Sequence, residues 1–95
     1  MPHFVVVNLA PTDPDTLAAY FKVGGAAVKK HGGKALAGGS REILESNGGG
    51  AQAHVILSFP DAQAARDWIN DPELADTHAL RRAGAQTTIT LLDPM

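Results

Sequence analysis

The fold of this chain is decided by residues 53–74, AHVILSFPDAQAARDWINDPEL. Residues 53–59 alternate with a period of two and are rich in β-branched and aromatic side chains, which is typical of a strand. Pro60 ends this strand, and Asp61 is a suitable N-cap for a helix whose apolar face includes Trp68. The stretch therefore predicts a central strand followed at once by a helix.

A second break follows at Asn70-Asp71-Pro72, and proline is well tolerated at the first position of a helix. We expect a short second helix from Pro72 to Arg82, with Gly84 closing its last turn. Gln86 to Leu92 alternates polar and apolar residues and predicts the last strand.

Toward the N-terminus, residues 4–9 form a β-branched run in which Asn8 is the only polar member, which predicts a strand that is apolar on both faces. Asp13 and Pro14 then mark the start of a helix that ends at His31-Gly32-Gly33. The apolar stripe of that helix is expected to contain Leu17, Phe21, Gly24 and Val28. A glycine on this stripe is unfavourable in a helix, so we expect Gly24 to allow close approach of the sheet or to leave room for a ligand.

Residues 34–44 read as a second strand with a bulge or bend at Gly38-Gly39, and residues 46–50 read as a turn. The element order is β-α-β-β-α-β, with the second crossover split in two. Right-handed crossovers then place the helices on one face of a four-stranded antiparallel sheet. The prediction is an α+β, ferredoxin-like domain over residues 1–95.

The amino-acid composition excludes several classes of function. The 95 residues include 44% hydrophobic and 19% charged side chains, which suits one globular domain, and the net charge of −2 offers no basic patch for nucleic acid. The chain has no cysteine, which excludes disulfides, thiolate chemistry and zinc held by cysteine. We see no signal peptide and no run long enough to cross a membrane, so we expect a cytoplasmic protein with no nucleic-acid or membrane partner.

The apolar residues on both faces of the sheet predict a partner. Two helical segments can cover only one face, yet Phe4 and Val6 lie opposite Val5 and Val7 in the first strand. An uncovered apolar face of this kind is unusual for a monomer. We therefore expect a homodimer joined through the sheet faces.

Four histidines titrate near neutral pH: His3, His31, His54 and His78. None has His-x-His or His-x-x-x-His spacing, so we expect no metal site. His54 lies on the central strand, where it either contacts a ligand as a possible base or forms a hydrogen bond across the dimer interface. His3 begins a neighbouring strand and is a candidate neighbour of His54. His31 is expected in solvent, and His78 either at a pocket edge or over the core.

Three further side chains have two readings each. Tyr20 and Trp68 are better explained by packing than by cofactor contacts. Arg41 either clamps a carboxylate or pairs with a glutamate at the surface. The candidate ligand-binding residues are Asn8, Tyr20, Arg41, His54, Trp68 and His78; no catalytic residue is assigned.

Specific motifs along almost the whole chain resemble a known family. They are Asn8, Thr12-Asp13-Pro14, Tyr20, His31-Gly32-Gly33-Lys34, Phe59-Pro60, Trp68-Ile69-Asn70-Asp71-Pro72-Glu73-Leu74 and Leu80-Arg81. On these residues the chain resembles the uncharacterised family called domain of unknown function 1330 (DUF1330), of the dimeric α/β-barrel superfamily. The resemblance implies a ferredoxin-like fold and a sheet-to-sheet homodimer, but no reaction. Superfamily relatives include cofactor-free monooxygenases, lactone isomerases and haem enzymes, so the fold does not fix the chemistry.

We expect a small homodimer that binds a small, largely apolar molecule between sheet and helices, without a cofactor. One version is an enzyme of the monooxygenase or isomerase kind. The alternative is a non-catalytic binding or structural dimer module of the same fold. A closed apolar cavity with convergent polar groups favours the first version, and a filled core favours the second.

Overall fold

The computed structural model contains both strands and helices and describes residues 1–48 and 52–95. The elements are β1 (His3–Pro11), α1 (Pro14–Lys30), β2 (Lys34–Ala37), β3 (Ala53–Phe59), α2 (Ala62–Asn70), the short 3-10 helix η1 (Pro72–Leu74), α3 (Ala75–Gly84) and β4 (Ala85–Leu92). No helix in the described part of the chain has the length and apolar content needed to cross a membrane.

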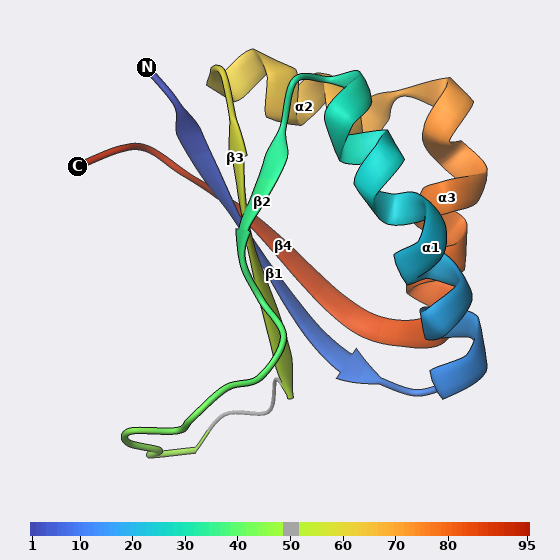
Figure 1. Cartoon of the computed structure of the whole chain (residues 1–95), viewed down its shortest axis with the longest axis vertical. Helices are drawn as coiled ribbons and strands as arrows, with labels where there is room; N and C mark the ends of the chain where they lie inside the picture. Colours follow the sequence, from blue (N-terminus) through green and yellow to red (C-terminus); the bar gives the residue numbers. More distant parts are fainter. Residues whose placement is uncertain (49–51) are drawn as a thin grey trace.

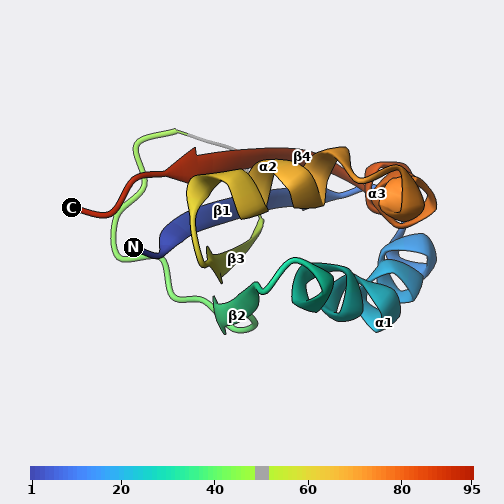
Figure 2. The same ribbon diagram turned by 90° about the horizontal axis from the view of Figure 1, so that it is seen from above.

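The four strands form one antiparallel sheet in the order β2-β3-β1-β4. The helices lie on one side of this sheet (Figure 1). Seen from above, α2 passes in front of β1 and β4, and α1 and α3 lie at the right (Figure 2). This is the βαββαβ, ferredoxin-like fold with helices on one face that the sequence predicts.

The strand register separates the side chains into two sets. Val5 pairs with Leu57 and Leu91, and all three face the helices because successive residues of a strand alternate between faces. The core on this helix face contains Val5, Val7, Leu9, Leu57, Phe59, Trp68 and Ala85 with residues of α1. Phe4, Val6 and Asn8 point to the opposite side, which we call the open face.

Aspartates begin the helical segments, as predicted. Each accepts a hydrogen bond from a backbone N–H in the first turn, which satisfies a donor that the helix itself leaves unpaired. The distances are 3.2 Å from Thr16 N to Asp13, 2.8 Å from Ala64 N to Asp61 and 2.9 Å from Glu73 N to Asp71.

The second strand is shorter than the predicted span of residues 34–44. It ends at Ala37, with the register shift between Ala35 and Ala37, and Gly39 has a φ of 81°, which a strand does not tolerate. Arg41 is therefore in an irregular segment and not in a strand. Gly48 has a positive φ, as the predicted turn requires, whereas Gly49 and Gly50 of that turn lie outside the described residues.

Two helical details also differ from the prediction. In α1 the buried aromatic residue is Tyr20, whereas Phe21 is 54% exposed, because the stripe is rotated toward α3 as well as the sheet. The predicted helix 72–82 is divided into η1 and α3, and α3 continues to Gly84. At that point a Cβ atom would lie only 2.6 Å from the backbone nitrogen of Leu17, so only glycine allows α3 to end against α1.

Candidate functional site

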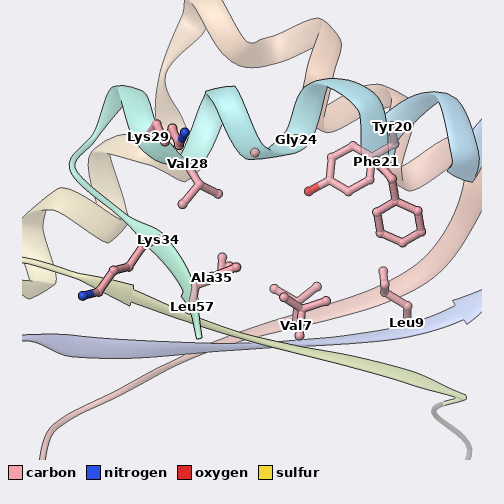
Figure 3. Close-up of a pocket in the computed structure, with 12 residues that line it drawn as sticks. Val7, Leu9, Tyr20, Phe21, Gly24, Val28, Lys29, Lys34, Ala35 and Leu57 are labelled. Atoms are coloured by element: carbon pink, nitrogen blue, oxygen red, sulfur yellow. The ribbon is translucent and has the colours of Figure 1, made fainter. Parts of the chain in front are cut away.

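A pocket of about 420 Å³ lies between α1 and the helix face of the sheet (Figure 3). Its floor comes from β1 and β3, its wall from one side of α1, and its rim from the end of α1 and the start of β2. The lining residues are Val7, Leu9, Tyr20, Phe21, Gly24, Gly25, Val28, Lys29, Lys34, Ala35, Val55 and Leu57. Most of these side chains are apolar, so the pocket offers a surface suited to an apolar molecule.

Gly24 gives the pocket its shape on the α1 side. A Cβ atom there would lie 3.0 Å from Cζ of Tyr20 and 3.2 Å from its hydroxyl oxygen. The missing side chain thus makes room for the Tyr20 ring beside the helix, and the hydroxyl points into the pocket (Figure 3). Within residues 1–48 and 52–95 this hydroxyl has no protein hydrogen-bond partner, so it is available to a ligand.

Two lysines supply the charge at the rim. Lys29 and Lys34 lie toward one end of the pocket, and the aromatic rings of Tyr20 and Phe21 lie toward the other (Figure 3). Lys30, the next residue of α1, turns away and contacts Asp71. Lys29 and Lys30 are adjacent in sequence, but Lys29 lines the pocket and Lys30 pairs with an aspartate outside it.

A buried polar cluster lies behind Tyr20, between α1, α2 and α3. The Arg81 side chain is 1% exposed, and its guanidinium carbon is 5.6 Å from the centre of the Tyr20 ring and 5.9 Å from that of Trp68. Arg81 Nη1 donates a hydrogen bond of 2.7 Å to Nδ1 of His78. In the described part of the chain no carboxylate forms an ion pair with Arg81, so aromatic faces and a neutral imidazole surround the cation.

The contacts fix the tautomer of His78. Because Nδ1 accepts from Arg81, the ring proton is on Nε2, which donates 2.9 Å to the carbonyl oxygen of Trp68. Burial lowers the pKa of His78, and the positive charges of Arg81 and Arg82 lower it further, against the opposing effect of the Trp68 hydrogen bond. His78 is accordingly a neutral, packed residue. Nε1 of Trp68 and Nε of Arg81 are buried and find no acceptor among the described residues.

The open face carries a different polar set. Asn8 and His54 are direct partners in the β1–β3 register, and Nδ1 of His54 donates 2.7 Å to Oδ1 of Asn8. Nη1 of Arg41 is 3.5 Å from Nε2 of His54. Arg41 and His54 also line a broad hollow of about 830 Å³ formed with residues 42–48 and Gln52. This hollow and the pocket under α1 are on opposite sides of the sheet.

The six candidate residues therefore do not converge on one site. Tyr20 lines the pocket under α1. Trp68 and His78 belong to the buried cluster behind it, and Asn8, Arg41 and His54 belong to the open face. The structure does contain the expected space between sheet and helices, but only one of the six residues lines it.

Two expectations about histidines are wrong. His31 is not simply solvated, because its Nε2 is 2.8 Å from Oδ2 of Asp71, an oxygen that also accepts 2.7 Å from Lys30. These hydrogen bonds hold the pKa of Asp71 well below its usual range and join the end of α1 to η1. His3 is far from His54 along the sheet, because β1 and β3 are antiparallel and His3 pairs with Phe59.

Sequence reasoning missed the buried arginine and the rim lysines. Leu74, His78 and Arg81 have the spacing of one helix face, which was the available signal for burial. An arginine is rarely buried without a carboxylate partner, so composition alone places it at the surface. The rim lysines have no such signal, because their neighbourhood depends on how α1 meets the edge of the sheet.

Comparison with known proteins gives a family and a fold. The model of the family described as "Domain of unknown function (DUF1330)" matches residues 2–95. A search of curated proteins found no match. A protein of unknown function from Rhodopseudomonas palustris has a similar structure, with a TM-score of 0.77 and 20% identity, over 99% of this chain and 82% of that one.

Two other solved structures are informative. A dimeric ferredoxin-like protein of unknown function from Jannaschia sp. CCS1 is similar with a TM-score of 0.76 and 11% identity, over 99% of this chain and 100% of that one. SnoaB, a cofactor-independent oxygenase from Streptomyces nogalater, is similar with a TM-score of 0.62 and 14% identity, over 99% of this chain and 91% of that one. At these identities the likeness is one of fold.

Proposed function

The chain belongs to the DUF1330 family, a domain of unknown function, and from that premise we propose that it binds a small, largely apolar molecule in the pocket between α1 and the sheet. The observation that supports this most is the pocket itself. At its floor Val7, Leu9 and Leu57 are at most 5% exposed, whereas Phe21 and Ala35 at its open side are exposed. On the α1 side the lining includes Gly24 and Gly25, and a Cβ atom at Gly25 would meet no atom within 4 Å, so the helix leaves space there.

Removing this apolar surface from water provides the driving force. Burial of apolar area is worth roughly 25 cal/mol per Å², and the pocket offers few polar groups that a ligand would leave unpaired. The Tyr20 hydroxyl is the exception, and it fits a ligand with one hydrogen-bonding oxygen. Apolar contacts with one oriented polar group are the usual composition of a small-molecule site.

The proposal includes a homodimer joined through the open faces. Phe4, Val6 and Ile56 form the apolar centre of this face, and Leu92 extends it with 45% of its surface exposed. A second copy related by two-fold symmetry would cover all four residues and meet the same patch on its partner. The dimeric description of the similar Jannaschia protein supports this arrangement.

An enzymatic version of the proposal is a cofactor-free oxygenase or isomerase, and the fold likeness to SnoaB favours it. In this version Tyr20 is the first residue to test, because its hydroxyl is the one hydroxyl group among the lining residues. Oxygen uptake with an oxidisable apolar phenol, measured for wild type and Tyr20→Phe, separates it from binding alone. Binding of the phenol without oxygen uptake would count against the oxygenase.

Binding is tested with a pair of variants on the same short strand. Ala35 lines the pocket, whereas Ala37 lies outside its lining, and both are exposed. We expect Ala35→Trp to fill the pocket and abolish the fluorescence increase of a neutral apolar dye such as Nile red. Ala37→Trp is the control for adding an indole to β2, and it should leave dye binding intact.

Thermal melting of both variants shows first whether each is folded. Equal dye binding by wild type and a folded Ala35→Trp protein would contradict the proposal, because the dye would then be bound elsewhere.

A further inference from the structure

The charged residues that line the pocket have one sign. Lys29 and Lys34 are the two basic residues of the lining, which contains no aspartate, glutamate or histidine. The whole chain has a net charge of −2, so the positive charge at the rim does not follow from an excess of basic residues in the chain. An apolar pocket with a positive end is complementary to a molecule with an apolar body and a negative end.

The two lysines are also not engaged by the protein. Over the described residues, 1–48 and 52–95, neither ammonium group forms an ion pair, and both side chains are exposed. Lys30 gives the contrast, because its Nζ is 2.7 Å from Asp71 and 2.5 Å from Glu73. Asp71 and Glu73 therefore pair with Lys30 and not with the rim lysines, whose ammonium groups are accessible to a ligand.

Lys29 is in the last turn of α1, where a cation is favoured by the negative end of the helix dipole. That effect does not explain Lys34, which begins an edge strand. The two residues come from different elements and share only the end of the pocket toward which they lie (Figure 3). Lys34 extends outward from the rim in Figure 3, and its flexible four-carbon chain can turn the ammonium group toward a ligand at that end.

The geometry points to a carboxylate with an apolar tail as the ligand class, which rests on the proposed binding function. The tail lies on the floor made by Val7, Leu9 and Leu57, and the carboxylate lies at the end marked by Lys29 and Lys34. The lysines stay hydrated, so they contribute as exposed ion pairs, each strengthening binding by about fivefold or less. The apolar tail supplies most of the affinity, and the carboxylate supplies selectivity.

Three probes with the same tail and different charge test this inference: decanoate, decanol and decyltrimethylammonium. Isothermal titration below the micelle concentration of each should rank decanoate first and decyltrimethylammonium last. Raising the salt concentration should weaken decanoate binding and leave decanol binding almost unchanged, because salt screens exposed charges.

Substitution of the lysines assigns the preference to the rim. Lys29→Met and Lys34→Met should each weaken decanoate binding up to about fivefold while leaving decanol binding unchanged. Lys22→Met is the matched control, since Lys22 is an exposed lysine of α1 outside the pocket lining. It should change neither affinity.

The outcomes separate this inference from the proposed function. Equal affinities of decanoate and decanol, both lost in Ala35→Trp, would overturn the carboxylate preference and keep the apolar pocket. A preference for decanoate that survives Lys29→Met and Lys34→Met together would also overturn it. If none of the three probes binds the folded wild type, both proposals fail.

Discussion

The two faces of the sheet contain similar numbers of β-branched residues, but they are covered to different extents by the rest of the chain. On the helix face, one part is filled by Phe59 and Trp68, and the part under α1 is left open as a pocket. On the open face, Val6 and Ile56 are only partly buried within the chain, and a polar pair, Asn8 and His54, lies at one end. The first face is suited to a small molecule and the second to a flat partner.

The difference shows what strand periodicity does to candidate residues. Asn8 follows Val7 in β1, and His54 precedes Val55 in β3, so each polar residue is adjacent in sequence to a pocket residue. Because side chains alternate, that adjacency places them on opposite sides of the sheet. Proximity along the chain is therefore a poor guide to shared function here.

The largest expected effect is on the filled part of the helix face. Trp68 is 1% exposed and packs against Phe59 with ring centres 5.4 Å apart. Trp68→Ala should lower the free energy of unfolding by about 3–5 kcal/mol, the usual cost of removing a buried aromatic side chain. Lys22→Ala at an exposed position of α1 is the control, and urea denaturation measures both. A loss below about 1 kcal/mol would show that this half is not the packed core.

The next effect concerns the open face and the dimer. Val6→Lys places a charge at the centre of the proposed interface, where a buried and unpaired charge costs several kcal/mol, of the order of 3–5. We expect the sedimentation mass at micromolar concentration to change from dimer to monomer. Gln86→Lys, an exposed position of β4 near the end of the same face, should stay dimeric.

Pocket binding should survive in the Val6→Lys monomer, since the pocket is on the other face. A wild type that is already a folded monomer at this concentration would contradict the interface and leave the pocket untouched.

A smaller effect is expected from the buried imidazole. The lowered pKa of His78 means that below pH 6.5, its ordinary value, the unfolded chain binds more protons than the folded one. The free energy of unfolding should therefore fall as the pH decreases through 6.5. Asp71 has a lowered pKa as well, but its contribution is lost only below about pH 3.8.

His78→Gln replaces the imidazole with an amide group that still offers one donor and one acceptor and does not titrate. Guanidinium denaturation as a function of pH should show a weaker decrease near pH 6.5 for this variant and the same decrease at acid pH. Superimposable pH profiles would remove His78 as the cause.

The smallest expected effect is a null result on the pocket. His54→Ala breaks the hydrogen bond to Asn8 on the open face, so the affinity for decanol should stay within about twofold of wild type, the range expected for a distant site. The same titration with Tyr20→Phe is the comparison, because that hydroxyl points into the pocket. A large loss of affinity in His54→Ala would mean that the two faces are coupled.

The sequence was a good guide to the fold and a partial guide to the site. The caps at Asp13, Asp61 and Asp71 and the strand at residues 53–59 depend on local chemistry, so they were predictable. The end of β2 was missed, because the apolar residues up to Leu44 hide the break that Gly39 makes with its positive φ.

The site depends on tertiary geometry that no local pattern encodes. Tyr20 and Phe21 are adjacent aromatic residues of α1, and only the packing of α3 decides that Tyr20 is the buried one. Likewise, the helical spacing of His78 and Arg81 allows burial but does not show that a cation will lie between two aromatic rings. Gly24 was a candidate because glycine is unfavourable inside a helix, and in the structure it lies in the wall of the pocket.

The central claim is that a ligand lies on the helix face of the sheet. The most direct test is the NMR spectrum of the side-chain methyl groups during titration with decanoate, using two pairs of neighbours: Val7 with Val6, and Leu57 with Ile56. We predict that the methyl signals of Val7 and Leu57, which line the pocket, shift on binding. Those of Val6 and Ile56, on the open face, should stay in place. Shifts of Val6 and Ile56 without shifts of Val7 and Leu57 would contradict the account.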